Sequence, residues 1–96
     1  MKRQEVLDTI SAHKKTLDEF KVRSLSIFGS VARDDAIPGS DVDILVEFTE
    51  AVGLFHFIRL KTRLESILGT RVDLATPDAL RKELRARVQS EAIRAA

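Results

Sequence analysis

The sequence predicts an α/β fold in which helices flank a sheet of three or more strands. Apolar residues recur at steps of four and three near the N-terminus, which is typical of an amphipathic helix. Apolar and polar residues alternate over residues 22–28 and 41–48, which is typical of strands. Because these segments alternate along a chain of 96 residues, we expect one compact domain over residues 1–96.

Three longer helices are expected from the apolar spacing. The first covers most of residues 2–20, and its apolar stripe, which includes a buried or half-buried histidine, is Val6, Ile10, His13, Leu17 and Phe20. The second ends at Gly69 as its C-cap, exposes His56, and has apolar positions at Leu54, Phe57, Ile58, Leu64, Ile67 and Leu68. The third begins with Thr76 as N-cap and Pro77 in its first turn, and carries Leu80, Leu84 and Val88.

The strands are expected at residues 22–28, 41–48 and 71–75. Gly29-Ser30 ends the first strand, and a short helix starts near Ser30 before a loop over residues 34–40. In the second strand, one face carries Val42, Ile44, Val46 and Phe48, and the other carries Asp41, Asp43, Leu45 and Glu47.

The charge balance gives no general attraction to nucleic acid or to an anionic membrane. The chain has 16 Lys and Arg against 15 Asp and Glu, a formal net charge of +1. It contains no cysteine, which excludes disulfides and thiolate metal sites. No apolar run approaches the roughly 18–20 residues of a membrane span. We therefore expect a cytoplasmic protein that does not enter a membrane or bind DNA or RNA directly.

Asp41 and Asp43 lie two residues apart in an expected strand, so their side chains point to one face, roughly 6.5–7 Å apart. Two ionised carboxylates at that separation repel by roughly 2–3 kcal/mol at an effective dielectric near 20. A divalent cation between them would replace this repulsion by attraction to the cation, and Mg²⁺ prefers such oxygen ligands. Taken alone, the pair is more simply interpreted as solvated, or as paired with Arg33 or Arg71.

Gly29-Ser30 adds a second feature of the same kind of site. A glycine between a strand and a helix lets the backbone approach a ligand closely. The N–H groups at the start of the helix, together with the Ser30 hydroxyl, could bind a phosphate. Taken alone, these residues would be an ordinary turn, but a phosphate cradle and a carboxylate pair on successive strands are what a metal–nucleotide site requires.

Gly29-Ser30, ten intervening residues and Asp41-Val42-Asp43 resemble the signature of the DNA polymerase β-like nucleotidyltransferases. The wider run over residues 27–46 is similar to the minimal nucleotidyltransferase branch, whose members are typically antitoxins encoded beside a HEPN-domain toxin. The resemblance implies a small nucleotidyltransferase fold, with a mixed three- to four-stranded sheet flanked by helices.

The resemblance also implies roles for individual residues. Gly29 and Ser30 would hold the nucleotide phosphates, and Asp41 and Asp43 would be catalytic residues that bind metal. A third carboxylate normally lies on a neighbouring strand as general base or metal ligand. Asp73 matches it, because Val72 and Leu74 alternate to the opposite face of the expected strand.

Two further positions need comment. Arg33 lies one helical turn past Ser30, so it could face the phosphates or pair with a carboxylate, and it is a candidate for the nucleotide site. Asp34 stands where the family often has glycine, but aspartate tolerates the left-handed backbone region better than most residues. The left-handed turn at Asp34 is therefore expected to form without glycine.

The function that the resemblance suggests is Mg²⁺-dependent transfer of AMP from ATP, with two ions, onto a Tyr hydroxyl of a cognate HEPN toxin. Two alternatives stay open. The chain could neutralise its partner by contact alone, without catalysis. It could also modify a small molecule, although such transferases usually carry an additional helical domain.

Overall fold

The structure is a computed structural model that describes residues 1–96. Its helices are α1 (Arg3–Ala12), α2 (Lys14–Glu19), α3 (Gly29–Ala32), α4 (Leu54–Leu68) and α5 (Lys82–Glu91), with a 3₁₀ turn, η1 (Pro77–Ala79). Its strands are β1 (Val22–Phe28), β2 (Val42–Phe48), β3 (Val72–Ala75) and β4 (Ile93–Arg94). The expected α/β class is therefore confirmed.

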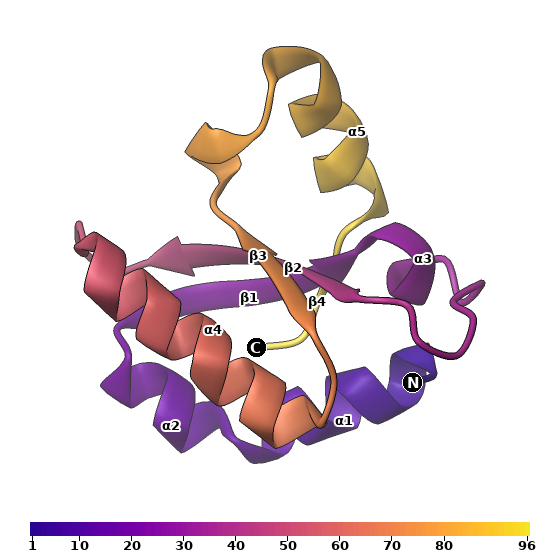
Figure 1. Ribbon diagram of the computed structural model, residues 1–96. Helices are drawn as coiled ribbons and strands as arrows, with labels where there is room; N and C mark the ends of the chain where they lie inside the picture. Colours follow the sequence, from indigo (N-terminus) through magenta and orange to yellow (C-terminus); the bar gives the residue numbers. More distant parts are fainter.

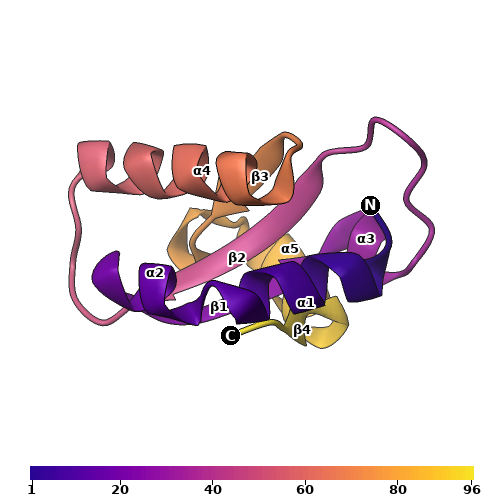
Figure 2. The same cartoon turned by 90° about the horizontal axis from the view of Figure 1, so that it is seen from below.

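The four strands form one mixed sheet in the order β3-β2-β1-β4. β1 is antiparallel to both β2 and β4, whereas β2 and β3 are parallel and connected through α4. Figures 1 and 2 show that α1, α2 and α4 cover one face of this sheet, while η1 and α5 rise from the other. The predicted mixed sheet of three to four strands is confirmed, and the two faces are covered very differently.

The hydrophobic core lies between the sheet and the layer of α1, α2 and α4. Strand residues that alternate toward these helices are fully buried, including Leu25, Ile27, Ile44 and Val46. The helices contribute buried side chains, namely Val6, Ile10, Leu17, Leu60, Leu64 and Leu68. In contrast, α5 has no buried residue. Burial of apolar area therefore stabilises one side of the sheet and leaves the other side open for a site.

The prediction of one helix over residues 2–20 was wrong in one respect. The helix is interrupted at His13, whose backbone leaves the helical region (φ −110°, ψ 24°). His13 is exposed, and its Nδ1 lies 2.8 Å from the carbonyl oxygen of Thr9. A continuous helix would have placed this polar ring in the apolar stripe, where burial without full pairing is costly. The interruption keeps Leu17 on the core and His13 in solvent.

The predicted end of α4 is confirmed, because Gly69 is a left-handed C-cap with φ 68°. Its buried side differs from the prediction. The core contacts are Leu60, Leu64 and Leu68, at steps of four, whereas Leu54 and Ile58 are exposed. His56 was expected in solvent but is half-buried, with Nε2 2.6 Å from the carbonyl oxygen of Phe20.

The C-terminal region also differs in detail. Thr76 does precede a helical turn with Pro77 in it, as expected, but this turn ends at Ala79. Leu80 is extended (φ −81°, ψ 141°), and α5 starts only at Lys82. The predicted stripe of one helix is thus divided between two elements. After α5, the chain returns to the sheet as β4, which no alternation in the sequence indicated.

Candidate functional site

Two carboxylates meet at neighbouring positions of the parallel strands. Asp43 on β2 and Asp73 on β3 are register partners, and Asp41 directly precedes β2. Their strand neighbours Val42 and Val72 are buried, while Asp43 is half-buried and Asp73 exposed. Asp43 and Asp73 therefore share the face that α1 and α4 do not cover, as the alternation predicts. The second expected strand begins one residue later than predicted, at Val42.

The Asp43 carboxyl group is the most perturbed acid of the site. Burial raises its pKa above the usual range, and the negative charges of Asp73 and then Asp41 raise the pKa further. The Arg33 guanidinium opposes this rise weakly. The three predicted carboxylates and Arg33 are consequently close enough to influence one another. A group of like charges on an open face favours a bound cation.

Gly29 has a specific reason to be glycine. Phe28 pairs with Asp43 across β1 and β2, which brings Gly29 beside the Asp43 side chain. A Cβ on Gly29 would overlap with Oδ2 of Asp43 and would lie 3.1 Å from its Cγ. The Gly29 backbone also has φ +69°, a region that favours glycine. Gly29 thus admits the Asp43 carboxylate, in addition to the phosphate role predicted for it.

Ser30 and Asp34 stand where the sequence predicts them. Ser30 lies half-buried in the first turn of α3, and its carbonyl accepts a hydrogen bond from the Asp35 N–H at 3.0 Å. Asp34 has φ +61°, so the expected left-handed turn without glycine is present. The loop that follows leads to Asp41.

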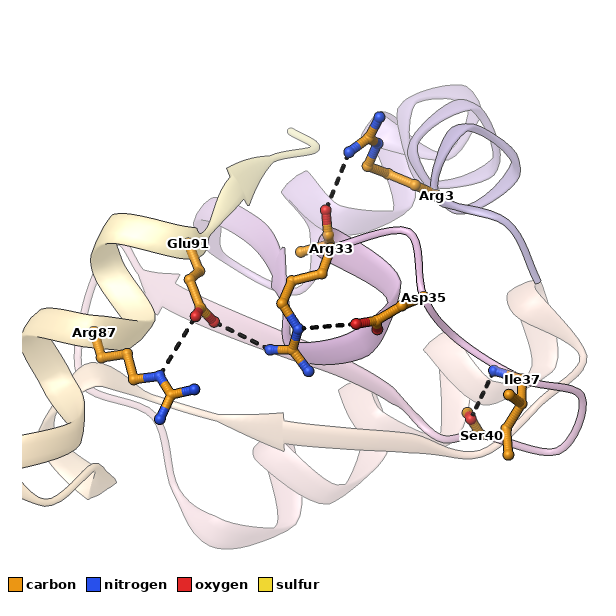
Figure 3. A network of polar contacts seen from close by, with 8 residues as sticks. Arg3, Arg33, Asp35, Ile37, Ser40, Arg87 and Glu91 are labelled. Carbon is orange, nitrogen blue, oxygen red and sulfur yellow. Dashed lines mark hydrogen bonds and ion pairs between the residues drawn. The ribbon is translucent and has the colours of Figure 1, made fainter.

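Arg33 is engaged with acidic side chains other than Asp41 and Asp43 (Figure 3). Its Nε donates to Asp35 at 3.3 Å and its Nη1 to Glu91 at 3.3 Å. Glu91 also accepts from Nε of Arg87 at 3.4 Å. These ion pairs connect the end of α3 to the end of α5. Sequence reasoning missed Glu91, because residues 33 and 91 are 58 positions apart and no local pattern connects them.

The carboxylates are not assembled as a ready metal site. Asp41 forms an ion pair with Arg71, with Oδ1 3.3 Å from Nε. No three carboxylate or imidazole side chains of the chain lie close enough together to hold an ion as they stand. The donors nevertheless have the right chemistry, since Mg²⁺ is bound through one or two carboxylates plus substrate phosphates. The chemistry of these residues therefore fits a magnesium ion, although their present arrangement does not enclose one.

A small mixed sheet with a glycine-serine turn beside paired carboxylates on an open face defines the class of nucleotide-transferring proteins. The family model described as a nucleotidyltransferase domain matches residues 10–95. The chain belongs to the nucleotidyltransferase-domain family, so the predicted enzyme class and the resemblance to the minimal nucleotidyltransferase branch are confirmed.

Three similar proteins refine this assignment. The protein adenylyltransferase MntA of Thermococcus cleftensis is 43% identical over 91 residues, which cover 94% of this chain and 92% of that protein. A solved structure provisionally described as a minimal nucleotidyltransferase is 36% identical, with a TM-score of 0.84 over 97% of this chain and 95% of that one.

The third similarity concerns the fold alone. It is to a chain in the complex of a tri-AMPylated HEPN toxin of Shewanella oneidensis with an MNT antitoxin. The identity is 21%, with a TM-score of 0.68, and the match covers 98% of this chain and 71% of that one.

None of the helices in this structure combines the length and the apolar character that a membrane crossing requires.

Proposed function

We propose that this chain transfers AMP from ATP onto a hydroxyl group of a protein partner, a Tyr of a HEPN-domain toxin, and thereby acts as an antitoxin. The observation that carries the proposal is the register pairing of Asp43 with Asp73, beside a glycine that admits the Asp43 carboxylate. The 43% identity to a protein adenylyltransferase across 94% of the chain supports AMP and a protein acceptor.

In this reaction the acceptor oxygen attacks the α-phosphorus of ATP. The bond from that phosphorus to the bridging oxygen breaks, and pyrophosphate leaves. Asp73 is the group proposed to accept the hydroxyl proton or to hold an activating ion, because it is exposed on the open face. Gly29, Ser30 and Arg33 are proposed to hold the phosphates, which requires Arg33 to turn from Glu91 toward them.

Magnesium ions, two in number, would be held by Asp41, Asp43 and Asp73. When bound, they would neutralise charge on the attacking and leaving oxygens. Asp41 must leave Arg71 to take part, and its exposed ion pair contributes little that would oppose this. The raised pKa of Asp43 supports the same assignment, because like charges around it would be relieved by a cation.

The open face of the sheet is consistent with a protein acceptor, because a protein partner can bring its own hydroxyl to the exposed Asp73. The proposal places the reaction in the cytoplasm, where ATP is available.

The test is the intact mass of a HEPN-domain partner protein after incubation with this chain and Mg²⁺–ATP. With the natural chain we expect a mass increase of one or more AMP groups. Asp73→Asn should bind ATP and partner but transfer AMP more slowly, by ~10²-fold or more. Asp18→Asn, at an exposed acid on α2, is the matched control and should transfer normally.

The competing candidate is a chain that neutralises its partner by contact. The ion pair between Asp41 and Arg71 is the observation in its favour, because it holds one predicted metal ligand away from the others. A partner that is fully neutralised without any added mass, with both the natural chain and Asp73→Asn, would establish this candidate and exclude the enzymatic proposal.

A further inference from the structure

The N-terminal turn of α4 presents an apolar surface to solvent. Leu54, Phe55 and Ile58 are 70%, 77% and 45% exposed. At 3.6 residues per turn these three side chains lie within roughly 100° of the helix circumference. The buried side of α4, formed by Leu60, Leu64 and Leu68, points elsewhere. We call the three exposed side chains the α4 patch. An exposed cluster of large apolar side chains is typical of a binding surface.

The α4 patch adjoins a groove of about 890 Å³. Leu54 belongs to both, so the two surfaces are continuous. The groove lies between the end of β2, the loop into α4, and η1, and α5 contributes Gln89. Its apolar lining includes Leu54, Phe57 and Pro77. In Figure 1 the end of β2 and the start of α4 lie at the end of the sheet that is remote from α3, whereas α5 lies on the side nearer α3. The groove and the α4 patch therefore form one surface away from the glycine-serine turn.

The charged side chains that line the groove all have one sign, and a cation beside it, Arg85, donates to the carbonyl oxygen of Pro77 at 3.1 Å. Glu47, Glu50 and Asp78 line the groove, and no Lys, Arg or His is among the lining residues. Glu50 is paired with Lys21 at 3.1 Å, whereas Glu47 and Asp78 have no ion pair. The whole chain has a net charge of +1, so this acidity is local. Complementarity requires an occupant that carries positive charge next to apolar side chains.

The groove is also placed to act together with the site. Glu47 follows Asp43 by four residues on the same strand, so both side chains point to the same face, roughly 13 Å apart. Asp43 pairs with Asp73, and Leu45 pairs with Ala75, which brings Thr76 and Pro77 beside the end of β2. A protein segment with its hydroxyl at Asp43 and Asp73 would reach the groove about four residues further on, if it is extended.

We propose that the groove and the α4 patch dock the acceptor protein, through a segment near the modified hydroxyl that presents apolar side chains flanked by Lys or Arg. This inference rests on the proposed function for the identity of the acceptor. A nucleotide is a poorer occupant, because its phosphates would be repelled by Glu47 and Asp78. Its base would also not reach Phe55 and Ile58 on the outer side of α4.

The first experiment measures binding and transfer separately, with the same HEPN-domain partner protein as the probe. Phe55→Ala combined with Ile58→Ala should weaken the complex by about ten-fold or more, as measured by calorimetry, and should raise the KM for the protein. The KM for ATP should not change. Ile37→Ala is the matched control, because Ile37 is an equally exposed apolar residue (70%) in the loop between α3 and β2.

The second experiment tests the charge. Compared with the natural chain, Asp78→Lys should weaken the complex and make its affinity less sensitive to salt. Asp18→Lys on α2 should have neither effect. An unchanged dissociation constant in the Phe55/Ile58 variant overturns the docking surface. An increase in the KM for ATP rather than in the KM for the protein overturns it as well. A natural chain that binds the protein without modifying it overturns the proposed function alone, and one that does not bind it overturns both.

Discussion

At the scale of single residues, Gly29 is where backbone and site chemistry meet. Gly29 and Gly69 have almost the same φ, +69° and +68°, but only at Gly29 does another side chain occupy the place of an added Cβ. Gly69→Ala should therefore lower the free energy of unfolding only by the cost of a left-handed residue, roughly 1–2 kcal/mol. Gly29→Ala should lower the free energy of unfolding by more, because the added methyl group overlaps with the Asp43 carboxylate. Urea unfolding of the two variants measures the difference.

A double variant separates the two causes. If the overlap is responsible, Gly29→Ala combined with Asp43→Ala should lose less stability than the sum of the two single changes. Equal losses for Gly29→Ala and Gly69→Ala would instead show that the Asp43 side chain moves aside freely, and that Gly29 is required only for its backbone conformation.

Asp43 makes stability depend on pH. Its folded-state pKa is raised, chiefly by burial and by Asp73, so the folded protein binds this proton more tightly than the unfolded chain does. The ionised carboxylate destabilises the fold above the folded pKa, and the effect disappears as the pH falls below the unfolded value of about 3.9. Asp43→Asn should thus raise the melting temperature at neutral pH without metal, and the gain should vanish in acid.

Magnesium provides the complementary measurement. If Asp43 is a ligand, Mg²⁺–ATP should raise the melting temperature of the natural chain by mass action, and it should do so much less in Asp43→Asn. Asp18→Asn is a suitable control, because Asp18 is an exposed acid on α2 that forms no ion pair and lies away from the glycine-serine turn. A similar rise in the melting temperature of all three proteins would show that Asp43 does not bind the metal.

The positions of these residues were accessible from the sequence because strand alternation is a local rule. Asp43 and Asp73 could be assigned to one face from Val42, Val72 and Leu74 alone. Their side-chain partners were accessible only in part. The pairing of Asp41 with Arg71 was one of the alternatives that the sequence left open, and the structure contains it. The pairing of Arg33 with Glu91 was not anticipated, because it joins exposed side chains that no local pattern connects.

At the scale of elements, α5 is held without a core of its own. It has no buried residue, and its end is connected to α3 through Glu91 and Arg33 (Figure 3). Exposed ion pairs contribute about 0–1 kcal/mol, so Glu91→Gln should change stability little. It should free Arg33, however, and tighter binding of ATP is expected if Arg33 faces the phosphates. Calorimetric titration with Mg²⁺–ATP measures this.

Arg87→Gln is the matched control for that experiment. It removes the other partner of Glu91, which leaves Glu91 fully available to Arg33, so ATP affinity should stay the same or fall slightly. Weaker ATP binding by Glu91→Gln would mean that the ion pair positions Arg33 for the nucleotide rather than withholding it.

Elements with strong periodicity were predicted well, and elements that depend on distant partners were not. The end of α4 at Gly69 and the alternation of β2 follow from local rules. The interruption at His13 reflects the cost of burying a polar ring, which a spacing pattern does not register. β4 has only two residues, and it exists because the edge of β1 is available to pair with it, so its own sequence carries no strand signal.

At the scale of the whole molecule, the fold separates stability from function by the two faces of one sheet. The helical layer of α1, α2 and α4 buries nearly all of the core, while the opposite face carries the half-buried Asp43, the exposed Asp41 and Asp73, and an acidic groove. This division explains how a chain of 96 residues can hold like charges together. The destabilising groups lie where solvent and ligands can reach them, and the core on the other face supports them.

The C-terminal segment joins the end of α5 to the packed side of the sheet. β4 pairs with β1 at Ser26 and Ile27, and the tail exchanges three further backbone hydrogen bonds with Leu25, of 2.8, 3.0 and 3.1 Å. Side chains from this segment also pack against the core, namely Ile93, Ala95 and Ala96. The segment therefore contributes to stability and also anchors α5.

Removal of residues 93–96 should test both contributions at once. The three lost backbone hydrogen bonds to Leu25, at about 0.5–1.5 kcal/mol each, set a lower bound of about 1.5–4.5 kcal/mol on the loss in the free energy of unfolding, because the β4 pairing and the packing of Ile93 are lost as well. Because the C-terminal end of α5 would then be held to the rest of the fold only by its exposed ion pair with Arg33, its amide protons should exchange much faster than those of α4. Arg94→Ala, which removes one exposed side chain and its contact with the Ala96 carbonyl, is the control and should change neither quantity appreciably. Hydrogen exchange that is slow in α5 after the truncation would show that α5 is held by contacts other than the returning strand, and the unfolding curve would still report what β4 contributes to the sheet.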